Sequence, residues 1–321
     1  MDSFEKRINY SSDIKPFLIS VCQDYRIGEY INHKIVPIGY EDLNLVLQTS
    51  NDKYFVKIFA DFRSDNDCLE YVNKISENIK AGVSHPKIIP SSQGNLYTSN
   101  FDGYKFRLTI MEYIDGVDFF EGKLSPNEDE KRFLVQQAAI INSINLKPTF
   151  IYDSWAIVNF LKEYEKSKNY LDNEALEKIE PLAKEFESLA IEELPHCFVH
   201  GDLIKTNVMK DKNDKLYIID FAVSNYYPRI VELAVLLCNM LFDKKPEIQK
   251  ENYRLALDEY QKKIKLIELE LKTLPLFNKI AHAMHVIRGT YEREVNKNLS
   301  QENSYWINLG RTGLGLDGKA I

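Results

Sequence analysis

Two carboxylates and one amide lie near one another in the segment FVHGDLIKTNVMKDKNDKLYIIDF, which runs from residue 198 to residue 221. They belong to Asp202, Asn207 and Asp220. Their oxygens are hard ligands suited to Mg²⁺, whose sites usually combine one or two protein carboxylates with water and substrate phosphate. Any one of these residues alone is better explained as a turn former that caps a loop. The three together, at this spacing, favour a magnesium site.

A β-hairpin over residues 207–220 would bring these side chains together. Its turn is predicted at residues 213–214, Asn-Asp, between two short apolar runs that can pair antiparallel. This pairing places Asn207 opposite Asp220, and the preceding loop carries Asp202 to the same end of the ribbon. The sequence therefore predicts a cluster of oxygen ligands at one end of a small hairpin.

The rest of the chain predicts a strand-rich first part and a helical second part. Apolar residues at helical spacing indicate a helix within the first 30 residues and another over residues 66–81. Strands are predicted over residues 43–49, 54–59, 88–89, 96–99 and 106–113. Helices are predicted over residues 127–144, 154–170, 174–189 and 230–242, and through most of residues 246–298. The expected fold class is α+β, with a small antiparallel sheet followed by a larger, mainly helical part.

Composition excludes several classes of protein. The 321 residues include 41 basic and 48 acidic side chains, and the resulting net charge of -7 disfavours a general nucleic-acid binder. Four scattered cysteines without a C-x-x-C pair indicate reduced thiols rather than a disulfide frame or a zinc site. The first ten residues lack the apolar core of a signal peptide, and the longest apolar run, residues 230–242, is too short to span a bilayer. A soluble, cytoplasmic protein is expected.

The string HGDLIKTN, followed by IIDF, resembles the catalytic and metal-binding segments of the aminoglycoside phosphotransferase/choline kinase family. Members of this family have a protein-kinase-like fold and include homoserine, methylthioribose and hydroxylysine kinases. The resemblance extends from about residue 35 to residue 242. It implies a bilobal fold, with a leading helix and a nucleotide-binding lobe in residues 1–113 and a helical catalytic and substrate lobe in residues 114–321.

The resemblance also implies roles for four residues of the central segment. Asp202 would be the catalytic base that orients and deprotonates the substrate hydroxyl, and His200 would fix the loop through hydrogen bonds. Asn207 and Asp220 would hold Mg²⁺ bridging the nucleotide phosphates. The loop reads H-G-D rather than H-R-D, and neither D-F-G nor A-P-E is present, which disfavours a protein substrate.

Lys57 is the expected phosphate-binding cation of the nucleotide half. It lies within an otherwise apolar strand, residues 54–59, and a lysine is rarely buried there without a partner. In the implied fold the following helix packs over this strand, and Glu70 on that helix is the preferred partner. Asp67 and Glu77 on the same helix remain competing candidates.

Other nucleotide contacts follow from the resemblance alone. Gly39 would belong to the phosphate lid, although its segment is nearly as well explained as a polar turn. The backbone of Glu112 and Ile114 would bind the adenine edge, with Met111 beside it. Ile219 would form part of the apolar floor under the base.

The later helices add few candidates. Arg229 and Glu232 are predicted to be structural rather than substrate-binding. Farther on, His282, His285 and Arg288 share one helix, and the preferred interpretation is a partly buried helix with satisfied polar groups. The two histidines make no metal motif without a third ligand.

Together these patterns predict a phosphotransferase that uses Mg²⁺ and ATP, with GTP as the alternative nucleotide. It would transfer the γ-phosphate to a hydroxyl of a small molecule: an amino-alcohol, an amino acid, a sugar or an aminoglycoside. The segment from residue 39 to residue 57 favours the homoserine and hydroxylysine kinase-like branch. No nucleic acid or membrane partner is expected, and the oligomeric state is left open. The alternative is a catalytically inactive kinase fold that serves as a binding or regulatory protein.

Overall fold

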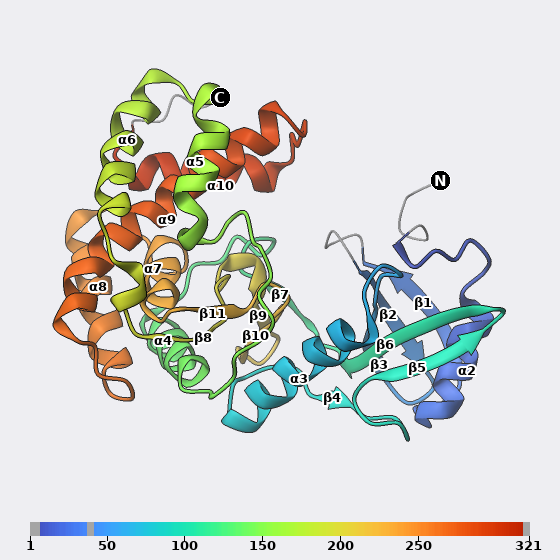
Figure 1. The fold of residues 1–321 in the computed structure, drawn as a ribbon. Coiled ribbons are helices and arrows are strands. Elements are labelled where there is room, and N and C mark those ends of the chain that lie inside the picture. Colours follow the sequence, from blue (N-terminus) through green and yellow to red (C-terminus); the bar gives the residue numbers. More distant parts are fainter. Residues whose placement is uncertain (1–6, 37–41, 317–321) are drawn as a thin grey trace. The chain divides into compact units, whose positions relative to one another are not determined.

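The computed structural model describes residues 7–36 and 42–316. The contacts divide the chain into two compact units (Figure 1). The first comprises the described part of Met1–Gly116 together with Asp211–Ile219, and the second comprises Val117–Lys210 with the described part of Asp220–Ile321. Each unit is described separately below. The functional division between residues 1–113 and 114–321 stays a prediction.

The first unit is built on a six-stranded sheet in the order β1-β2-β3-β6-β4, with β5 paired to β6. Its elements are α2 (Lys15–Tyr25), β1 (Tyr30–Ile35), β2 (Leu43–Thr49), β3 (Lys53–Ile58), α3 (Asp65–Ala81), β4 (Ile88–Ile89), β5 (Tyr97–Phe101) and β6 (Tyr104–Glu112). The described strands of this sheet pair antiparallel. The hairpin predicted around residues 50–52 is present as β2 and β3, whereas β1 was not predicted.

The two faces of this sheet differ in chemistry. On one face, Leu45, Val56 and Ile110 join a core that includes the buried side of α2, where Phe17 stacks on Phe106 with ring centroids 4.1 Å apart. Side chains alternate between the faces of a strand, so Lys57 points to the other face. There α3 packs against β6, and the Lys57 ammonium lies 5.1 Å from the ring centroid of Tyr71 on α3. The sheet therefore holds its lysine away from the apolar core.

The second unit is mainly helical. Its helices are α4 (Glu128–Asn142), α5 (Phe160–Ser167), α6 (Asn173–Glu187), α7 (Ile230–Cys238), α8 (Pro246–Tyr260), α9 (Glu268–Glu294) and α10 (Gln301–Gly313), with short 3₁₀ turns at Ile157–Asn159, Lys168–Tyr170, Ile191–Glu193 and Lys205–Asn207. Strand β8 (His196–Val199) pairs antiparallel with β11 (Asn225–Pro228). The strands β7 (Gly116–Asp118) and β9 (Val208–Asp211) pair with each other, whereas β10 (Leu216–Ile218) is grouped with the first unit.

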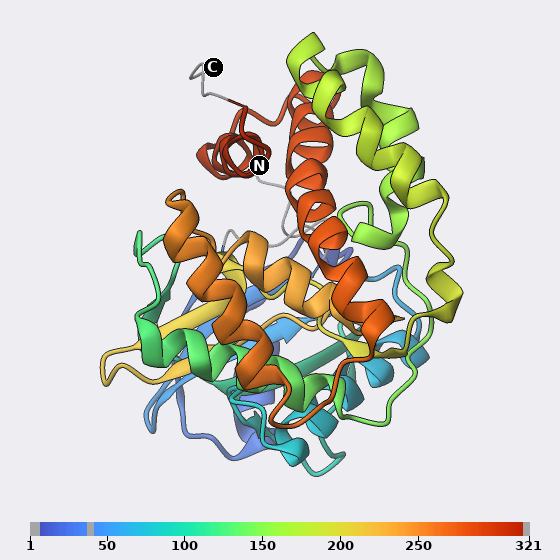
Figure 2. The same cartoon turned by 90° about the vertical axis from the view of Figure 1, so that its left-hand side faces the viewer.

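Helix α9 is the central helix of the second unit. It packs against α5, α6, α7 and α10, and Figure 2 shows α10 lying beside it. The predicted helical region over residues 246–298 is broken between α8 and α9, and the Glu270 carboxylate caps the start of α9 by accepting the Ile267 N–H at 2.9 Å. The same carboxylate binds Arg229 at 2.7 Å. This contact is distant in sequence, which explains why periodicity did not reveal the break.

Candidate active site

The loop after β8 is fixed by hydrogen bonds at its first residues. The buried His200 donates its backbone N–H to Oε2 of Glu232 at 2.6 Å, and its ring Nδ1 lies 3.2 Å from the Asp202 backbone N–H, which donates to it. Between them Gly201 has φ of +80°, in the left-handed region that favours glycine. Glu232 lies on α7, so this helix holds the loop in place. Glu232 thus has a structural contact, as the sequence predicted.

Asn207 ties the far end of the loop to Asp202. Its Nδ2 donates to the Asp202 carbonyl oxygen at 2.9 Å and to the Asp202 Oδ2 at 2.7 Å. Both bonds use the amide nitrogen, so the amide oxygen of Asn207 is the atom able to take a cation. The pair lies within the second unit and matches the proximity predicted from the sequence.

Negative charge is concentrated around Asp202. Desolvation by burial raises the pKa of Asp202, and the nearby charges of Asp153, Asp220 and Glu302 raise it further, while the Asn207 hydrogen bond lowers it; the pKa reaches about 8. Burial also raises the pKa of Asp153. Because several acids oppose ionisation of one another here, the electrostatics of the site favour binding of a cation. Asp153 was not among the residues singled out from the sequence, since it lies far from the motif.

Asp220 occupies an unusual backbone conformation. Its φ is +64°, and its Oδ1 accepts the Ala222 N–H at 3.2 Å. Aspartate is one of the few L-residues that adopt the left-handed region with modest strain. The exposed Asp220 is followed by fully buried Phe221, whose ring lies 4.5 Å from that of His200. The buried ring thus anchors the exposed carboxylate beside the loop of Asp202.

In the first unit Lys57 has a carboxylate partner that the sequence did not reveal. Its Nζ lies 3.3 Å from Oδ2 of Asp42, and Nε of Arg63 lies 2.9 Å from Oδ1 of the same residue. The backbone N–H of Ala60 also donates to Oδ1, at 3.0 Å. The Asp42 side chain is only 2% exposed and that of Lys57 is 10% exposed. The buried lysine is therefore held by an acid in the residue just before β2.

The electrostatics of Asp42 are opposite to those of Asp202. Burial raises the pKa of Asp42, but the charges of Lys57 and Arg63, with hydrogen bonds from Ala60 and Arg63, outweigh it and hold the pKa below its usual value. Asp42 is thus kept ionised. Its position could have been found from the hairpin register, because Leu43 pairs with Ile58 and Asn44 with Lys57.

The predicted partner Glu70 stays a prediction. It lies on α3, the helix that packs over the face of the sheet carrying Lys57. Of its two competitors, Asp67 accepts hydrogen bonds from the backbone and hydroxyl of Ser64 in the capping box of α3, at 2.9 and 2.8 Å. Glu77 lies 2.7 Å from Lys80. Both competitors therefore have local structural roles.

The remaining nucleotide residues are placed as follows. Gly39 lies outside the described residues. Met111 and Glu112 end β6, where they pair with Phe55 and Tyr54 of β3, and Ile114 follows in the connector. Ile219 groups with the first unit, and the strand before it is bound to that unit by the hydrogen bond from the Ile218 N–H to the Ser84 carbonyl, 2.7 Å long. Roles for these residues stay predictions.

The described part of the second unit contains hollows of different size and charge. The larger, about 530 Å³, is lined by polar and basic residues that include Lys205, Lys244, Lys245, Asp243 and Tyr305. Lys205 belongs to the loop between Asp202 and Asn207, its pKa is lowered by burial, and its Nζ lies 5.6 Å from the ring centroid of Tyr305. Lys205 therefore places a positively charged side chain of the candidate catalytic loop in the wall of this hollow.

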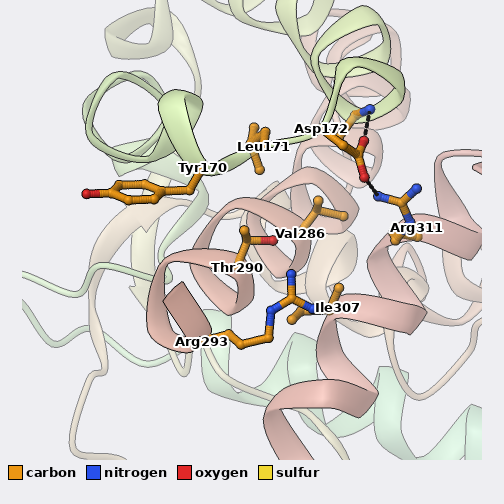
Figure 3. A pocket seen from close by; sticks show the side chains of 9 residues that line it. Tyr170, Leu171, Asp172, Val286, Thr290, Arg293, Ile307 and Arg311 are labelled. Atoms are coloured by element: carbon orange, nitrogen blue, oxygen red, sulfur yellow. Dashed lines mark hydrogen bonds and ion pairs between the residues drawn. The ribbon is translucent and has the colours of Figure 1, made fainter. Parts of the chain in front are cut away.

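The smaller hollow, about 250 Å³, lies between α6, α9 and α10 (Figure 3). Arg311, on its wall, is bound to Asp172 at 2.8 Å and to Glu174 at 3.2 Å. Arg293 is likewise bound to Glu294 at 2.9 Å. Because both arginines are engaged by carboxylates, this hollow offers weaker recognition of an anion than the larger one.

Curated relatives match most of the chain. A homoserine kinase of Agrobacterium fabrum is 21% identical over 275 residues, which cover 84% of this chain and 83% of the relative. A homoserine kinase of Bartonella henselae is 23% identical over 302 residues, covering 88% and 86%.

Solved structures show the same fold at low identity. Spectinomycin phosphotransferase in complex with ADP and its antibiotic superposes with a TM-score of 0.66 at 13% identity, covering 94% of this chain and 98% of that one. Amicoumacin kinase in complex with AMP-PNP, Ca²⁺ and its ligand gives 0.63 at 18% identity, covering 94% and 93%. The choline kinase of Streptococcus pneumoniae gives 0.55 at 13% identity, covering 95% and 99%. The predicted protein-kinase-like α+β fold is thereby confirmed.

The family itself is shown by a profile. Residues 33–263 match the phosphotransferase enzyme family. The matched range includes the loop of Asp202, the residue Asp220 and the strand of Lys57. The prediction of a kinase with an alcohol group as acceptor is confirmed at this level. The described part of the chain contains no helix with the length and apolarity needed to cross a membrane. With its loop, acids and fold in agreement, this chain belongs to the phosphotransferase enzyme family.

Proposed function

We propose that this protein transfers the γ-phosphate of ATP, with Mg²⁺, to a hydroxyl of a small amino acid. The observation that carries the proposal is that Asn207 binds Asp202 through its amide nitrogen, which leaves its oxygen for a cation, while the charge of Asp220 acts on Asp202. Phosphoryl transfer depends mainly on positioning and charge neutralisation, and this arrangement provides both.

Asp202 is the proposed base. Asn207 engages its Oδ2 at 2.7 Å, which orients the carboxylate and leaves Oδ1 for the acceptor hydroxyl. His200 acts as a positioning residue, because its ring accepts the Asp202 N–H and its own N–H is held by Glu232. A base of this kind orients the nucleophile and receives its proton as the new P–O bond forms.

Asn207 and Asp220 are the proposed ligands of Mg²⁺. The donor set fits the ion, since it offers one amide oxygen and an exposed carboxylate amid several acids, and leaves further positions for phosphate oxygens. When bound, the ion neutralises charge on the nucleotide phosphates. The left-handed conformation of Asp220 supports a functional role, because strained residues gather at such sites.

The proposed nucleotide site lies in the first unit. Lys57 provides the phosphate-directed cation, and its ion pair with Asp42 holds it in position. Glu70 is proposed as the second acid for Lys57. Gly39 of the lid, the linker residues Met111, Glu112 and Ile114, and the floor residue Ile219 complete the proposed site. Adenine nucleotides in the compared structures favour ATP over GTP.

A zwitterionic acceptor fits the larger hollow. Lys205, Lys244 and Lys245 provide positive charge for a carboxylate, and Asp243 provides negative charge for an ammonium group. The curated relatives named above are homoserine kinases, whose substrate name is that of a small hydroxyl amino acid. We propose homoserine or a similar amino acid as the acceptor, without nucleic acid or membrane partners. Four free cysteines agree with a reducing, cytoplasmic location.

The direct test is to measure ADP formation with ATP and Mg²⁺ against a panel of hydroxyl compounds. The panel should contain homoserine, hydroxylysine, choline, a sugar and an aminoglycoside. Homoserine or a close amino acid should give the largest kcat/KM. Preference for choline or an aminoglycoside would overturn the acceptor assignment alone, whereas no turnover of any acceptor would overturn the kinase assignment.

A lysine variant tests the hollow. Lys245→Ala should raise KM for an amino-acid acceptor about tenfold, the effect of losing roughly 1.4 kcal/mol of binding, with little change in KM for ATP. Lys250→Ala, a nearby exposed lysine that does not line the hollow, is the matched control. Equal KM values in the two variants would remove the hollow from acceptor binding.

A further inference from the structure

Three metal-ligating side chains meet in the interior of the second unit, outside the site described above. Cys238, at the end of α7, meets His282 and His285 of α9, and one ligand atom of each lies within 4.8 Å of the others. Cys238 Sγ is 3.3 Å from Nδ1 of His282 and 3.3 Å from Nδ1 of His285. Two histidines on one helix were not a metal motif by themselves, and the fold supplies the third ligand.

We propose that Cys238, His282 and His285 bind a borderline-soft divalent metal ion, with Zn²⁺ as the ion of best fit. Thiolate and imidazole are the ligands that Zn²⁺ prefers, whereas the Mg²⁺ of a kinase prefers oxygen. Zn–S and Zn–N bond lengths in tetrahedral sites imply an S to N separation of about 3.5 Å. The two observed separations are close to this value.

The thiol of Cys238 carries one proton and can donate it to only one of the two imidazole nitrogens, so the second contact requires the sulfur to accept a weak N–H hydrogen bond. One central cation would satisfy the sulfur and both nitrogens at once. On binding, the Sγ–H proton is released to solvent and an S–metal bond forms in its place.

The histidine rings are held by the surrounding helices. His285 stacks on Trp306 with ring centroids 5.4 Å apart, and Phe242 packs edge-on against His282 at 4.9 Å. Helix α10 approaches so closely at Gly313 that a side-chain carbon there would overlap the His282 ring. Imidazole rings fixed in this way suit a metal ligand.

The larger hollow provides an entry path. Its wall includes Phe242, which contacts His282, and Leu309, whose backbone hydrogen-bonds to His282. It also includes Asn239, the neighbour of Cys238. A water molecule entering from this side can complete a four-coordinate shell, as in zinc sites with three protein ligands.

Cobalt provides the first test on the full-length chain. The protein is stripped with a chelator and titrated with Co²⁺ in the absence of Mg²⁺ and nucleotide. We expect one Co²⁺ per chain, a thiolate-to-cobalt charge-transfer band and tetrahedral d–d bands, all removed by one equivalent of Zn²⁺. Co²⁺ should also quench tryptophan fluorescence, because the only two tryptophans, Trp155 and Trp306, both lie near His285.

Variants identify the ligands. Cys238→Ser should abolish the charge-transfer band and weaken Co²⁺ binding by at least about 100-fold. Loss of a group that only hydrogen-bonds to a metal ligand already weakens metal binding by up to about 100-fold, and loss of the ligand itself should cost at least as much. Cys68→Ser, which changes another buried cysteine, should retain both. His285→Gln should weaken binding similarly. A wild-type chain without the band, or a band that survives Cys238→Ser, would overturn the proposal.

A measurement on the wild-type chain covers the case in which Cys238→Ser fails to fold. Zn²⁺ should slow alkylation of Cys238 under partly denaturing conditions by at least tenfold and release one proton per ion in weak buffer, while Mg²⁺ does neither. Equal alkylation of Cys238 with and without Zn²⁺ would exclude the site. None of these readouts depends on kinase activity.

Discussion

Asp42 and Asp202 are both aspartates set among charged groups, but their surroundings are opposite. Asp42 lies between two cations in the sheet unit, and its pKa is lowered. Asp202 is desolvated among other acids in the helical unit, and its pKa is raised to about 8. In the first arrangement the Asp42 carboxylate already has two cationic partners within the protein. In the second, other acids surround the Asp202 carboxyl group, which is the electrostatic pattern expected of the proposed base.

The largest effect is expected from Asp202→Asn. The amide retains the shape of the side chain but cannot accept the acceptor's proton, so kcat should fall by about 10²–10⁴. Nucleotide affinity should change little, and folding should be preserved because the amide is a neutral group of the same shape as the carboxyl group. Steady-state kinetics and nucleotide titration measure the two. Turnover near that of the wild type would show that Asp202 is no more catalytic than Asp42.

A second substitution tests whether Asp220 binds the metal ion. Asp220→Asn keeps the left-handed conformation accessible but removes the charge, so Mg²⁺-dependent ATP affinity should fall by at least about tenfold. Asp214→Asn is the matched control, because Asp214 has a similar φ of +62° in the hairpin turn. Isothermal titration with and without Mg²⁺ compares them. If both variants bind MgATP like the wild type, Asp220 is not a metal ligand.

Asp42→Asn should damage stability instead. It removes the charge facing Lys57 and Arg63 while retaining an acceptor for the Ala60 N–H, and we expect a loss of about 3 kcal/mol, the lower end for breaking a buried ion pair. Chemical denaturation measures the loss. Asp102→Asn, at an exposed turn of the same unit, should cost almost nothing. A loss no larger than that of the control would mean that Asp42 is structurally dispensable.

Double-mutant cycles can separate the two acids proposed for Lys57. In the free energy of unfolding, Lys57→Met should couple to Asp42→Asn by about 0.5–3 kcal/mol. In turnover, Lys57→Met should couple to Glu70→Ala, so that the double variant loses less activity than the two single losses combined. Additive losses of turnover would show that Glu70 is an ordinary helix acid.

The smallest signal is a difference in pH dependence, measured on the metal-free chain without nucleotide. The pKa of Asp202 is raised on folding, so its contribution to stability is present below about pH 4 and is lost as the pH rises toward 8. Asp202→Asn should therefore gain stability relative to the wild type across this range. The pKa of Asp42 is lowered, so its contribution is present above about pH 4 and is lost at lower pH. Parallel stability curves for wild type and both variants would contradict this contrast.

The same two aspartates show what the sequence could reveal. Asp202, Asn207 and Asp220 belong to one short segment, so their spacing predicted both the loop and the family. Asp42 acts on Lys57 across a hairpin, and only the strand register brings the two together. Asp153 reaches Asp202 from a distant connector, which no local pattern reports. Glu70 remains an inference from the fold.

Secondary structure shows the same contrast between elements specified by their own residues and elements that depend on distant contacts. Periodicity predicted α3, α4 and the hairpin of β2 and β3, because each is specified by its own residues. The short strands β8 and β11 were missed, since they exist through pairing with each other. The region predicted as helical before residue 298 is divided between α8 and α9, and Glu270, which caps the start of α9, has its partner Arg229 elsewhere in the chain.

Helix α9 has a consequence for synthesis of the protein on the ribosome. It packs against α5, α6 and α7, all of which precede it in the chain. The surfaces through which those helices contact α9 therefore stay uncovered by it until α9 has been translated, although α5 contacts α6 and α7 contacts α4 before then. Domains fold as units during synthesis, and exposed apolar surface invites aggregation. The helical unit should accordingly acquire protease resistance late in translation, and chaperones should bind its nascent chain before α9 appears.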